Sequence, residues 1–205
     1  MKYFDLEEEY LKEFIALQSV ISISSELPSL VFGPGFSNFR FFEFDYILSE
    51  SFWPVLKALA TSSGDSHLLF WVLMPDPAKY YKQQFGRYGV IRFDTADSEG
   101  DFANVLFQAL GGNAADALAY NAKRVAVYSP STKWAIWGDR VQEIGVVAQQ
   151  AESSPPNCWG TIPLYQASDE ATRRVLARAT RARTIPDEFM QNLKKNYQRG
   201  FDDGA

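Results

Sequence analysis

Cysteine and histidine, the residue types that build thiol and zinc sites, are almost absent from this sequence. Its 205 residues include one cysteine, Cys158, and one histidine, His67. One cysteine cannot form a disulfide within the chain, so nothing supports an oxidising compartment. Zinc is held by clusters of cysteine and histidine, and two such residues cannot supply four ligands. The sequence therefore excludes a disulfide framework and a zinc site built from these residue types.

Long apolar runs are also lacking. The longest, HLLFWVLMP at 67–75, has the length of a strand, whereas a membrane span needs roughly 20 residues. The first residues, MKYFDLEEE, are acidic and amphipathic, whereas a secretory signal combines basic residues with a continuous apolar stretch. We therefore expect a cytoplasmic protein without a membrane-spanning segment.

Glycine-rich phosphate-binding motifs are missing as well. Gly33-Pro34-Gly35 precedes a predicted strand and has no Lys-Ser/Thr continuation, and Gly111-Gly112 joins two predicted helices. A phosphate cradle needs glycines where a strand turns into a helix, with backbone amides converging on the anion. Both segments are therefore predicted to be turns, and no cofactor is expected.

Acidic residues gather between 94 and 101, but without the spacing of a calcium site. A calcium loop needs ligands at alternate positions and a distal bidentate glutamate, and this string has neither. Carboxylates at the start of a helix cap it and favour its dipole. We therefore expect no metal here, and we predict that Asp97, Glu99 and Asp101 cap and charge the start of the following helix.

Apolar and aromatic residues are plentiful, at 46% and 15% of the chain, which is enough for a packed core and argues against disorder. Apolar residues at helical spacing predict a first helix at 5–19, with Leu6, Tyr10, Phe14 and Leu17 on its inner side. Similar spacing predicts helices at 50–64, with Ser51 as the N-cap, and at 75–86 and 98–112. Two further helices are predicted to begin at Ser168 and Pro186.

Strands alternate with these helices. Apolar and polar residues alternate at 39–48, which predicts a strand with one solvent-exposed face. The apolar run at 67–74 predicts a central strand buried on both faces. Residues 89–93 form another predicted strand, and a hairpin joins 133–138 to 143–149. Residues 113–128 fit a helix, although their latter half could equally be a strand.

This order of elements predicts an α+β fold with a mixed or mainly antiparallel sheet flanked by helices. Residues 1–165 are expected to form the core. A helical C-terminal extension, 166–205, is expected to pack on that core, so the chain is predicted to be a single domain overall.

Charge is unevenly distributed along the chain, whose net charge is −5. Residues 1–50 contain nine acidic and three basic residues, whereas 170–199 contain eight basic and three acidic residues. An acidic body repels nucleic-acid phosphates and favours basic partners. The plainer alternative is that the basic end folds against the acidic start.

The basic end contains an arginine stripe. Arg174, Arg178 and Arg181 share one helical face, but a nucleic-acid interface needs interleaved aromatic residues or a basic domain. A solvated or internally paired face is therefore the preferred interpretation.

Two tryptophans are predicted to lie on opposite faces of the hairpin. Trp134 and Trp137 differ by an odd number of positions, so they cannot both reach the same core layer. Both are buried if helices cover both faces of the sheet. If one face is open, one of them becomes a candidate interface residue.

Several motifs between residues 50 and 150 resemble a known group of proteins. They are FWPVL at 52–56, PDPxxYY at 75–81 and FGxYG at 85–89, followed by an alanine-rich helix and WAIWGDR at 134–140. This order resembles small bacterial immunity proteins of polymorphic-toxin systems. The resemblance implies a protein that binds a cognate toxin in the cytoplasm and protects the producing cell. The arginine-rich C-terminal segment falls outside it.

The leading hypothesis is therefore an immunity-type protein, not an enzyme, that occludes the active site of a cognate toxin. A basic, nuclease-like toxin would suit the acidic start, because an acidic partner can occlude a phosphate-binding cleft. Nucleic acid and membranes are not expected as partners, and a homo-oligomer stays open. The candidate contacts are Glu7, Glu8, Glu9 and Glu13 in the first helix and Trp137, Asp139 and Arg140 in the hairpin.

The alternative is an enzyme, a hydrolase or a transferase, with a cleft site that uses carboxylates or Cys158. A nucleophilic cysteine needs a nearby base, and His67 is the one imidazole in the chain. No flanking motif supports this pair. A carboxylate site cannot be chosen from 25 acidic residues without geometry.

Overall fold

The computed structural model of the chain describes residues 1–151, 158–160, 162–179 and 184–198. In that part of the chain, seven strands form one sheet in the order β1-β4-β3-β5-β6-β7-β2, and every neighbouring pair is antiparallel. The strands are β1 (Lys2–Tyr3), β2 (Phe36–Glu43), β3 (His67–Met74), β4 (Val90–Asp94), β5 (Arg124–Tyr128), β6 (Trp134–Asp139) and β7 (Ile144–Gln150). The predicted α+β class is confirmed, with an antiparallel sheet.

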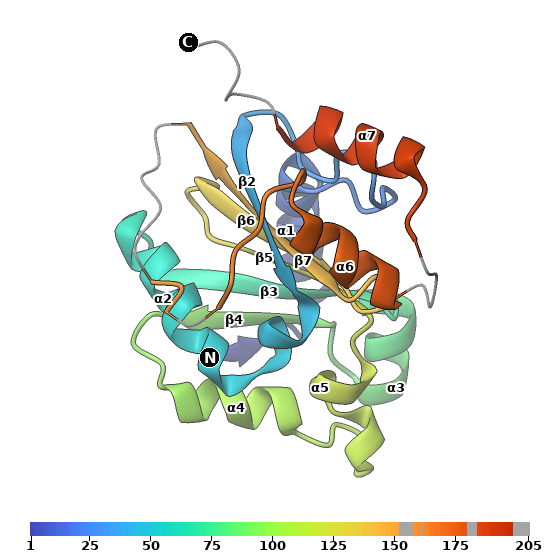
Figure 1. Cartoon of the computed structure of the whole chain (residues 1–205). Coiled ribbons are helices and arrows are strands. Elements are labelled where there is room, and N and C mark those ends of the chain that lie inside the picture. The colour runs from blue at the N-terminus through green and yellow to red at the C-terminus, as the bar shows by residue number, and fades with distance from the viewer. Residues whose placement is uncertain (152–157, 161, 180–183, 199–205) are drawn as a thin grey trace.

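Helices cover both faces of this sheet. One apolar layer joins the sheet to α1 (Glu7–Val20), α6 (Glu170–Ala179) and α7 (Asp187–Tyr197). The other layer joins it to α2 (Trp53–Ser62), α4 (Glu99–Phe107) and α5 (Leu118–Asn121). In Figure 1, α2 and α4 lie at the lower left of the sheet, and α6 and α7 at its upper right. Short helices complete the description: η1 (Phe44–Leu48), η2 (Glu50–Phe52), η3 (Pro77–Lys82), α3 (Gln83–Phe85) and η4 (Ala114–Asp116).

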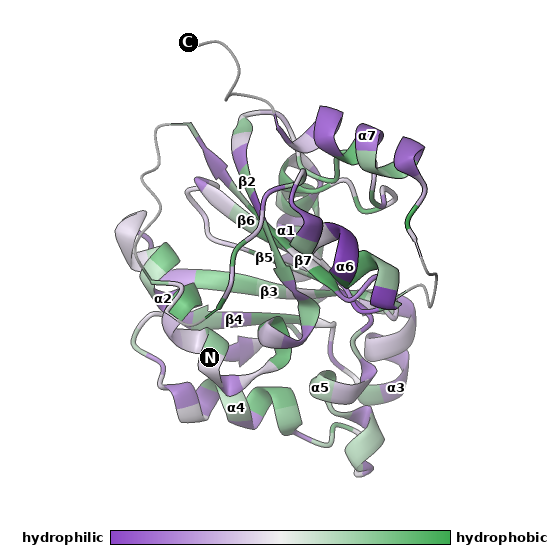
Figure 2. Ribbon diagram, in the orientation of Figure 1, coloured by the Kyte–Doolittle hydropathy of each residue, from purple (hydrophilic) through white to green (hydrophobic). Residues whose placement is uncertain are grey.

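The central strand β3 follows directly from its sequence. It pairs with β4 and β5 along its two edges, and helices cover both of its faces, so nearly every side chain can be apolar. Leu69 and Trp71 enter the layer of α1, while Leu68, Phe70 and Val72 enter the layer of α2. Figure 2 shows β3 mostly in the green of apolar residues, whereas the outer helices α6 and α7 are largely purple. The predicted central strand is confirmed.

The predicted strand at 39–48 is wrong in its second half. β2 ends at Glu43, which pairs with Ile144, the first residue of β7. Beyond that point β2 has no strand to pair with, and the chain turns into η1. Ile47, assigned to a wet face by the alternation, is fully buried.

Two predicted helix boundaries also differ. Ser51 does not cap α2; it lies in η2, and its hydroxyl is 2.9 Å from that of Ser49. α4 ends at Phe107, before the predicted Gly111-Gly112, because Gln108 is already extended and the next residues form a turn closed by Gly112 N–H to Ala109 O.

The ambiguous segment 113–128 contains both predicted structures. Asn113 caps the short helix η4 by accepting a hydrogen bond from Ala115 N–H, as expected of a capping residue. The segment then forms α5, and its latter half is the strand β5.

The predicted hairpin is confirmed as β6 and β7, but it does not lie at the edge of the sheet. β5 pairs with β6 and β2 pairs with β7, so both strands have two neighbours. Trp134 and Trp137 face opposite layers, and both are buried because helices cover both faces.

α6 and α7 pack beside β2. Val175 and Leu176 of α6 enter the α1 layer, and Tyr197 of α7 meets Phe39 and Phe41 edge-on at ring distances of 5.2 and 5.3 Å. None of the described helices is long and apolar enough to span a membrane.

Candidate functional site

The helix α1 is held firmly on the sheet by its inner side. The ring of Tyr10 stacks on that of Tyr88 at 4.1 Å, and Leu17 and Val20 are buried. The hydroxyl of Tyr128 donates a hydrogen bond to the carbonyl oxygen of Glu13 at 3.3 Å. The backbone of the helix is therefore fixed, and its outer side chains present a preformed surface.

The outer side of α1 exposes apolar side chains. Leu11 is 48% exposed and Ile15 is 69% exposed, and their i, i+4 spacing makes them neighbours on the helix surface. Leu6, expected on the inner side, precedes the helix and is 61% exposed. We call the exposed residues of this helix the α1 outer face: Glu7, Glu8, Leu11, Lys12, Ile15, Gln18 and Ser19.

The four predicted acidic contacts of the first helix divide into two pairs. Glu7 and Glu8 are exposed on the α1 outer face, and no ion pair involves either of them within the described residues. Glu9 and Glu13 are half-buried on the flank of the helix, and both carboxylate oxygens of Glu9 lie 2.9 Å from Nζ of Lys2. Glu7 and Glu8 are therefore the two acidic contacts that are exposed and have no ion-pair partner within the described residues, whereas Glu9 is paired and Glu13 is half-buried.

The three predicted contact residues of the hairpin do not form an exposed surface. Trp137 is fully buried, so it cannot reach a partner, and its assignment as an interface residue is wrong because α1 covers its face of the sheet. Asp139 is 4% exposed and accepts hydrogen bonds from Nε and Nη2 of Arg124 at 3.0 and 2.7 Å. Arg140 donates to the carbonyl oxygens of Ala119 and Tyr120 at 2.6 and 2.8 Å. Asp139 and Arg140 tie the hairpin to neighbouring segments.

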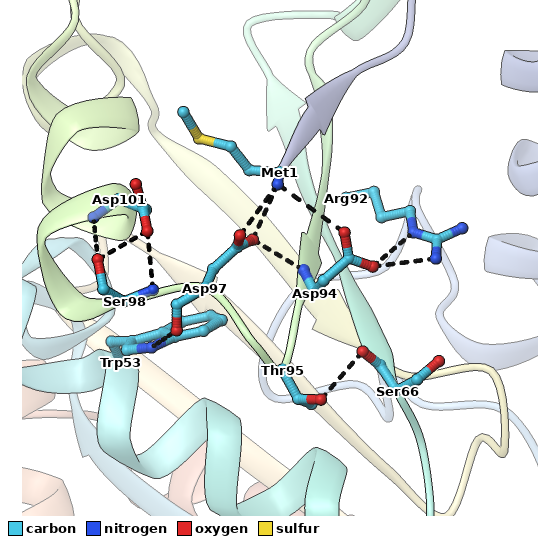
Figure 3. Close-up of polar contacts among 9 residues, drawn as sticks. All are labelled: Met1, Trp53, Ser66, Arg92, Asp94, Thr95, Asp97, Ser98 and Asp101. Atoms are coloured by element: carbon cyan, nitrogen blue, oxygen red, sulfur yellow. Dashed lines mark hydrogen bonds and ion pairs between the residues drawn. The ribbon is translucent and has the colours of Figure 1, made fainter.

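The acidic string at 94–101 organises the start of α4 (Figure 3). Ser98 and Asp101 form a reciprocal capping box, and these hydrogen bonds from Ser98 hold the pKa of Asp101 below its usual value. The side chain of Asp97 accepts a hydrogen bond from Asp94 N–H at 2.9 Å and lies 3.0 Å from the amino group of Met1. The predicted capping role is confirmed for Asp101. Among the described residues, no group of three or more His, Cys, Asp and Glu side chains is arranged to hold a metal ion.

Cys158 and His67 lie against opposite faces of the sheet. Cys158 packs on the layer of α2, with its Sγ 4.0 Å from the carbonyl oxygen of Val55, whereas His67 lines a pocket beside α1. Burial raises the pKa of the Cys158 thiol, which is the reverse of what a nucleophilic thiolate needs. The two side chains therefore do not form a nucleophile and base pair.

The arginine stripe is paired in part. Nη2 of Arg178 lies 2.9 Å from Oε1 of Glu43, and Nη1 of Arg173 lies 3.0 Å from Oδ1 of Asp187. Arg174 is exposed beside Arg178, and Arg181 lies outside the described residues. The ion pair between Arg178 and Glu43 joins the basic end of the chain to its acidic first 50 residues. The predicted alternative, in which the basic end folds against the acidic start, therefore holds for this pair.

Leu11 and Ile15 were not among the predicted contact residues. Their signal was available, because both positions fall on the side of the helix opposite Tyr10 and Leu17. No family model, curated protein or solved structure matches the chain. The assignment of a role therefore rests on the residues described above.

Proposed function

We propose that the protein is an immunity-type inhibitor that binds a cognate toxin through the α1 outer face and occludes the toxin's active site. The observation that carries the proposal is the exposure of Leu11 and Ile15 next to the exposed carboxylates of Glu7 and Glu8. The carboxylates have a local explanation, since acidic residues stabilise the first turn of a helix. The two apolar side chains contribute little to the stability of the fold while they face water.

Such a face suits a protein partner. Apolar side chains supply binding energy once water is excluded, and charges around them give specificity and fast association. The aromatic contacts beneath α1 hold the face in one conformation, which lowers the ordering cost of binding. The matching surface would be a basic cleft with an apolar depression, as in an enzyme that acts on phosphodiesters.

The decisive experiment is co-expression with the product of the adjacent gene. We expect a one-to-one complex in size-exclusion chromatography, weakened by salt, and loss of the neighbour's toxicity in the same cells. Leu11→Ser with Ile15→Ser, and separately Glu7→Lys with Glu8→Lys, should each weaken binding by about 10- to 100-fold, which corresponds to about 1.4 to 2.8 kcal/mol.

Matched control variants are available elsewhere on the surface. Val141 is 68% exposed in the hairpin turn, and Glu188 is exposed in the first turn of α7. Val141→Ser and Glu188→Lys should leave affinity within about twofold of the unmodified protein. The proposal is wrong if the neighbour neither binds nor harms cells. It is also wrong if Ile15→Ser only converts a homodimer of this chain into monomers.

A further inference from the structure

A small pocket lies beside α1, on the flank that carries Glu9 and Glu13, and it shares Lys12 with the α1 outer face. Its volume is about 210 Å³, and its ionisable lining consists of Lys2, Glu9, Lys12, Glu13, His67 and Arg92. Its apolar lining is Phe4 and Leu69. Since a water molecule occupies about 30 Å³ in the liquid, the pocket has room for one compact polar group.

The sheet register brings cations together at this pocket. Lys2 of β1 lies directly opposite Arg92 of β4, an arrangement that is destabilising for two like charges unless an anion compensates. Each cation already has a carboxylate partner, and one of these, Glu9, is itself part of the pocket lining. Nζ of Lys2 meets Glu9 at 2.9 Å, and Nε and Nη2 of Arg92 meet Oδ1 of Asp94 at 3.1 and 3.0 Å.

A third cation comes from the helix. Lys12 of α1 also lines the pocket, and no ion pair involves it within the described residues. Lys2, Lys12 and Arg92 therefore face two lining carboxylates, Glu9 and Glu13. The lining carries a cationic excess although the whole chain has a net charge of −5.

His67 adds a polar group to the same wall. It is half-buried at the start of β3, with Nδ1 3.4 Å from Oγ of Ser66. Burial lowers the pKa of His67, and Arg92 lowers it further, against the opposing effects of Asp94, Asp65 and Glu13. The charged groups around the imidazole thus come from β1, α1, β4 and the loop before β3: Lys2, Glu9, Lys12, Glu13, Arg92, Asp94 and Asp65. A neutral imidazole can donate one ring N–H to an anion without adding a charge.

We propose that this pocket binds the phosphate group of a small ligand, with Arg92, Lys12 and Lys2 as its cationic contacts and His67 as a neutral donor. Arginine matches phosphate oxygens with two parallel N–H donors, and lysine acts as a point charge. A phosphate group offers three acceptor oxygens, one for each of the three cations, whereas a carboxylate offers two. The site shares Lys12 with the α1 outer face, but none of the observations behind it rests on the role proposed for that face.

The lone histidine gives a direct test by NMR, because the chain has one imidazole Cε1–H signal. Sulfate is the first probe, since it stays dianionic where histidine titrates; acetate is the carboxylate probe, and sodium chloride at equal ionic strength is the reference. We expect sulfate to raise the pKa of His67 saturably, with a Kd on the order of millimolar, and inorganic phosphate to move the same signal at fixed pH.

Variants distinguish the binding of an anion in the pocket from the general screening of charges by salt. Arg92→Gln and Lys12→Gln should each weaken the sulfate-dependent shift by about tenfold, whereas Lys79→Gln, at an exposed lysine of η3, should leave it unchanged. The readout is the difference between sulfate and chloride, because Arg92→Gln by itself alters the pKa of His67. Equal shifts in chloride and sulfate, a stronger response to acetate, or an unchanged response in both pocket variants would each overturn the proposal.

Discussion

At the scale of single residues, a buried ion pair lies beside the hairpin turn. Arg124 pairs with Asp139 and also with Glu26, whose carboxylate is 2.6 Å from Nη2. The Asp139 side chain is 6% exposed and that of Glu26 is 61% exposed. The same Asp139 also accepts hydrogen bonds from the N–H groups of Val141 and Gln142. The two acids therefore differ in burial while sharing one cation.

This contrast predicts unequal effects of removing each acid. Asp139→Ala should lower the free energy of unfolding by about 3 kcal/mol, because it leaves Arg124 without its buried partner. Glu26→Ala should lower the free energy of unfolding by less than about 1 kcal/mol, because exposed ion pairs contribute little to stability. Urea unfolding of both variants, followed by tryptophan fluorescence, measures the difference. Equal losses in the two variants would contradict this account.

At the scale of elements, two glycines of the sheet make room for neighbouring aromatic and apolar side chains, and one of them, Gly138, lies under the helix η1. Gly138 and Gly145 lie opposite each other on β6 and β7. A Cβ on Gly138 would meet Cδ1 of Ile47 and would lie 2.9 Å from Cδ2 of Phe44. Gly138 therefore lets η1 approach the sheet where β2 has ended, whereas Gly145 makes room for the ring of Phe42 in β2.

Adding a methyl group at this contact should therefore destabilise the protein. Gly138→Ala is expected to cost about 1 to 3 kcal/mol, as overpacking of a buried site does. Gly100→Ala is the matched control, and it is expected to change the stability in the opposite direction. Gly100 lies in α4, where the nearest atom to a new Cβ is 3.7 Å away, and alanine should stabilise the helix by up to about 1 kcal/mol. Thermal unfolding of the two variants distinguishes them, and a stabilising Gly138→Ala would refute the packing argument.

At the scale of the whole molecule, the core contains many tyrosine hydroxyls. Burial is the main cause that raises the pKa of Tyr3 and of Tyr10 to about 12 from an ordinary value of 10.0. Burial likewise raises the pKa of Tyr81, Tyr128 and Tyr197. The folded protein therefore keeps these phenols protonated at a pH where the unfolded chain loses its protons.

The sign of the alkaline effect follows from this difference. Above pH 10 the unfolded state binds fewer protons than the folded state, so the free energy of unfolding falls as pH rises. We expect stability to be nearly constant from about pH 7 to 9 and to fall steeply between about 10 and 12. Urea titrations at each pH measure this, and Tyr81→Phe should make the fall shallower. A stability that is flat through pH 11 would contradict it.

Much of the local structure was predictable because its causes lie close together in the sequence. Ser98 and Asp101 form their cap three residues apart, β3 needs only its continuous apolar run, and the hairpin needs two such runs around a turn. The candidate site was predictable in part: Glu7 and Glu8 are exposed as expected.

The sequence by itself determined the α+β class, the central strand and the acidic first turn of α1, since periodicity and composition set which faces are apolar. Only the tertiary structure decided the strand order, the end of β2 at Glu43 and the burial of Trp137. For Leu11 and Ile15 the sequence indicated the outer side of α1, and the tertiary structure decided that this side stays exposed. The physical reason is that a pattern defines the two sides of an element, whereas burial depends on which distant segments cover each side.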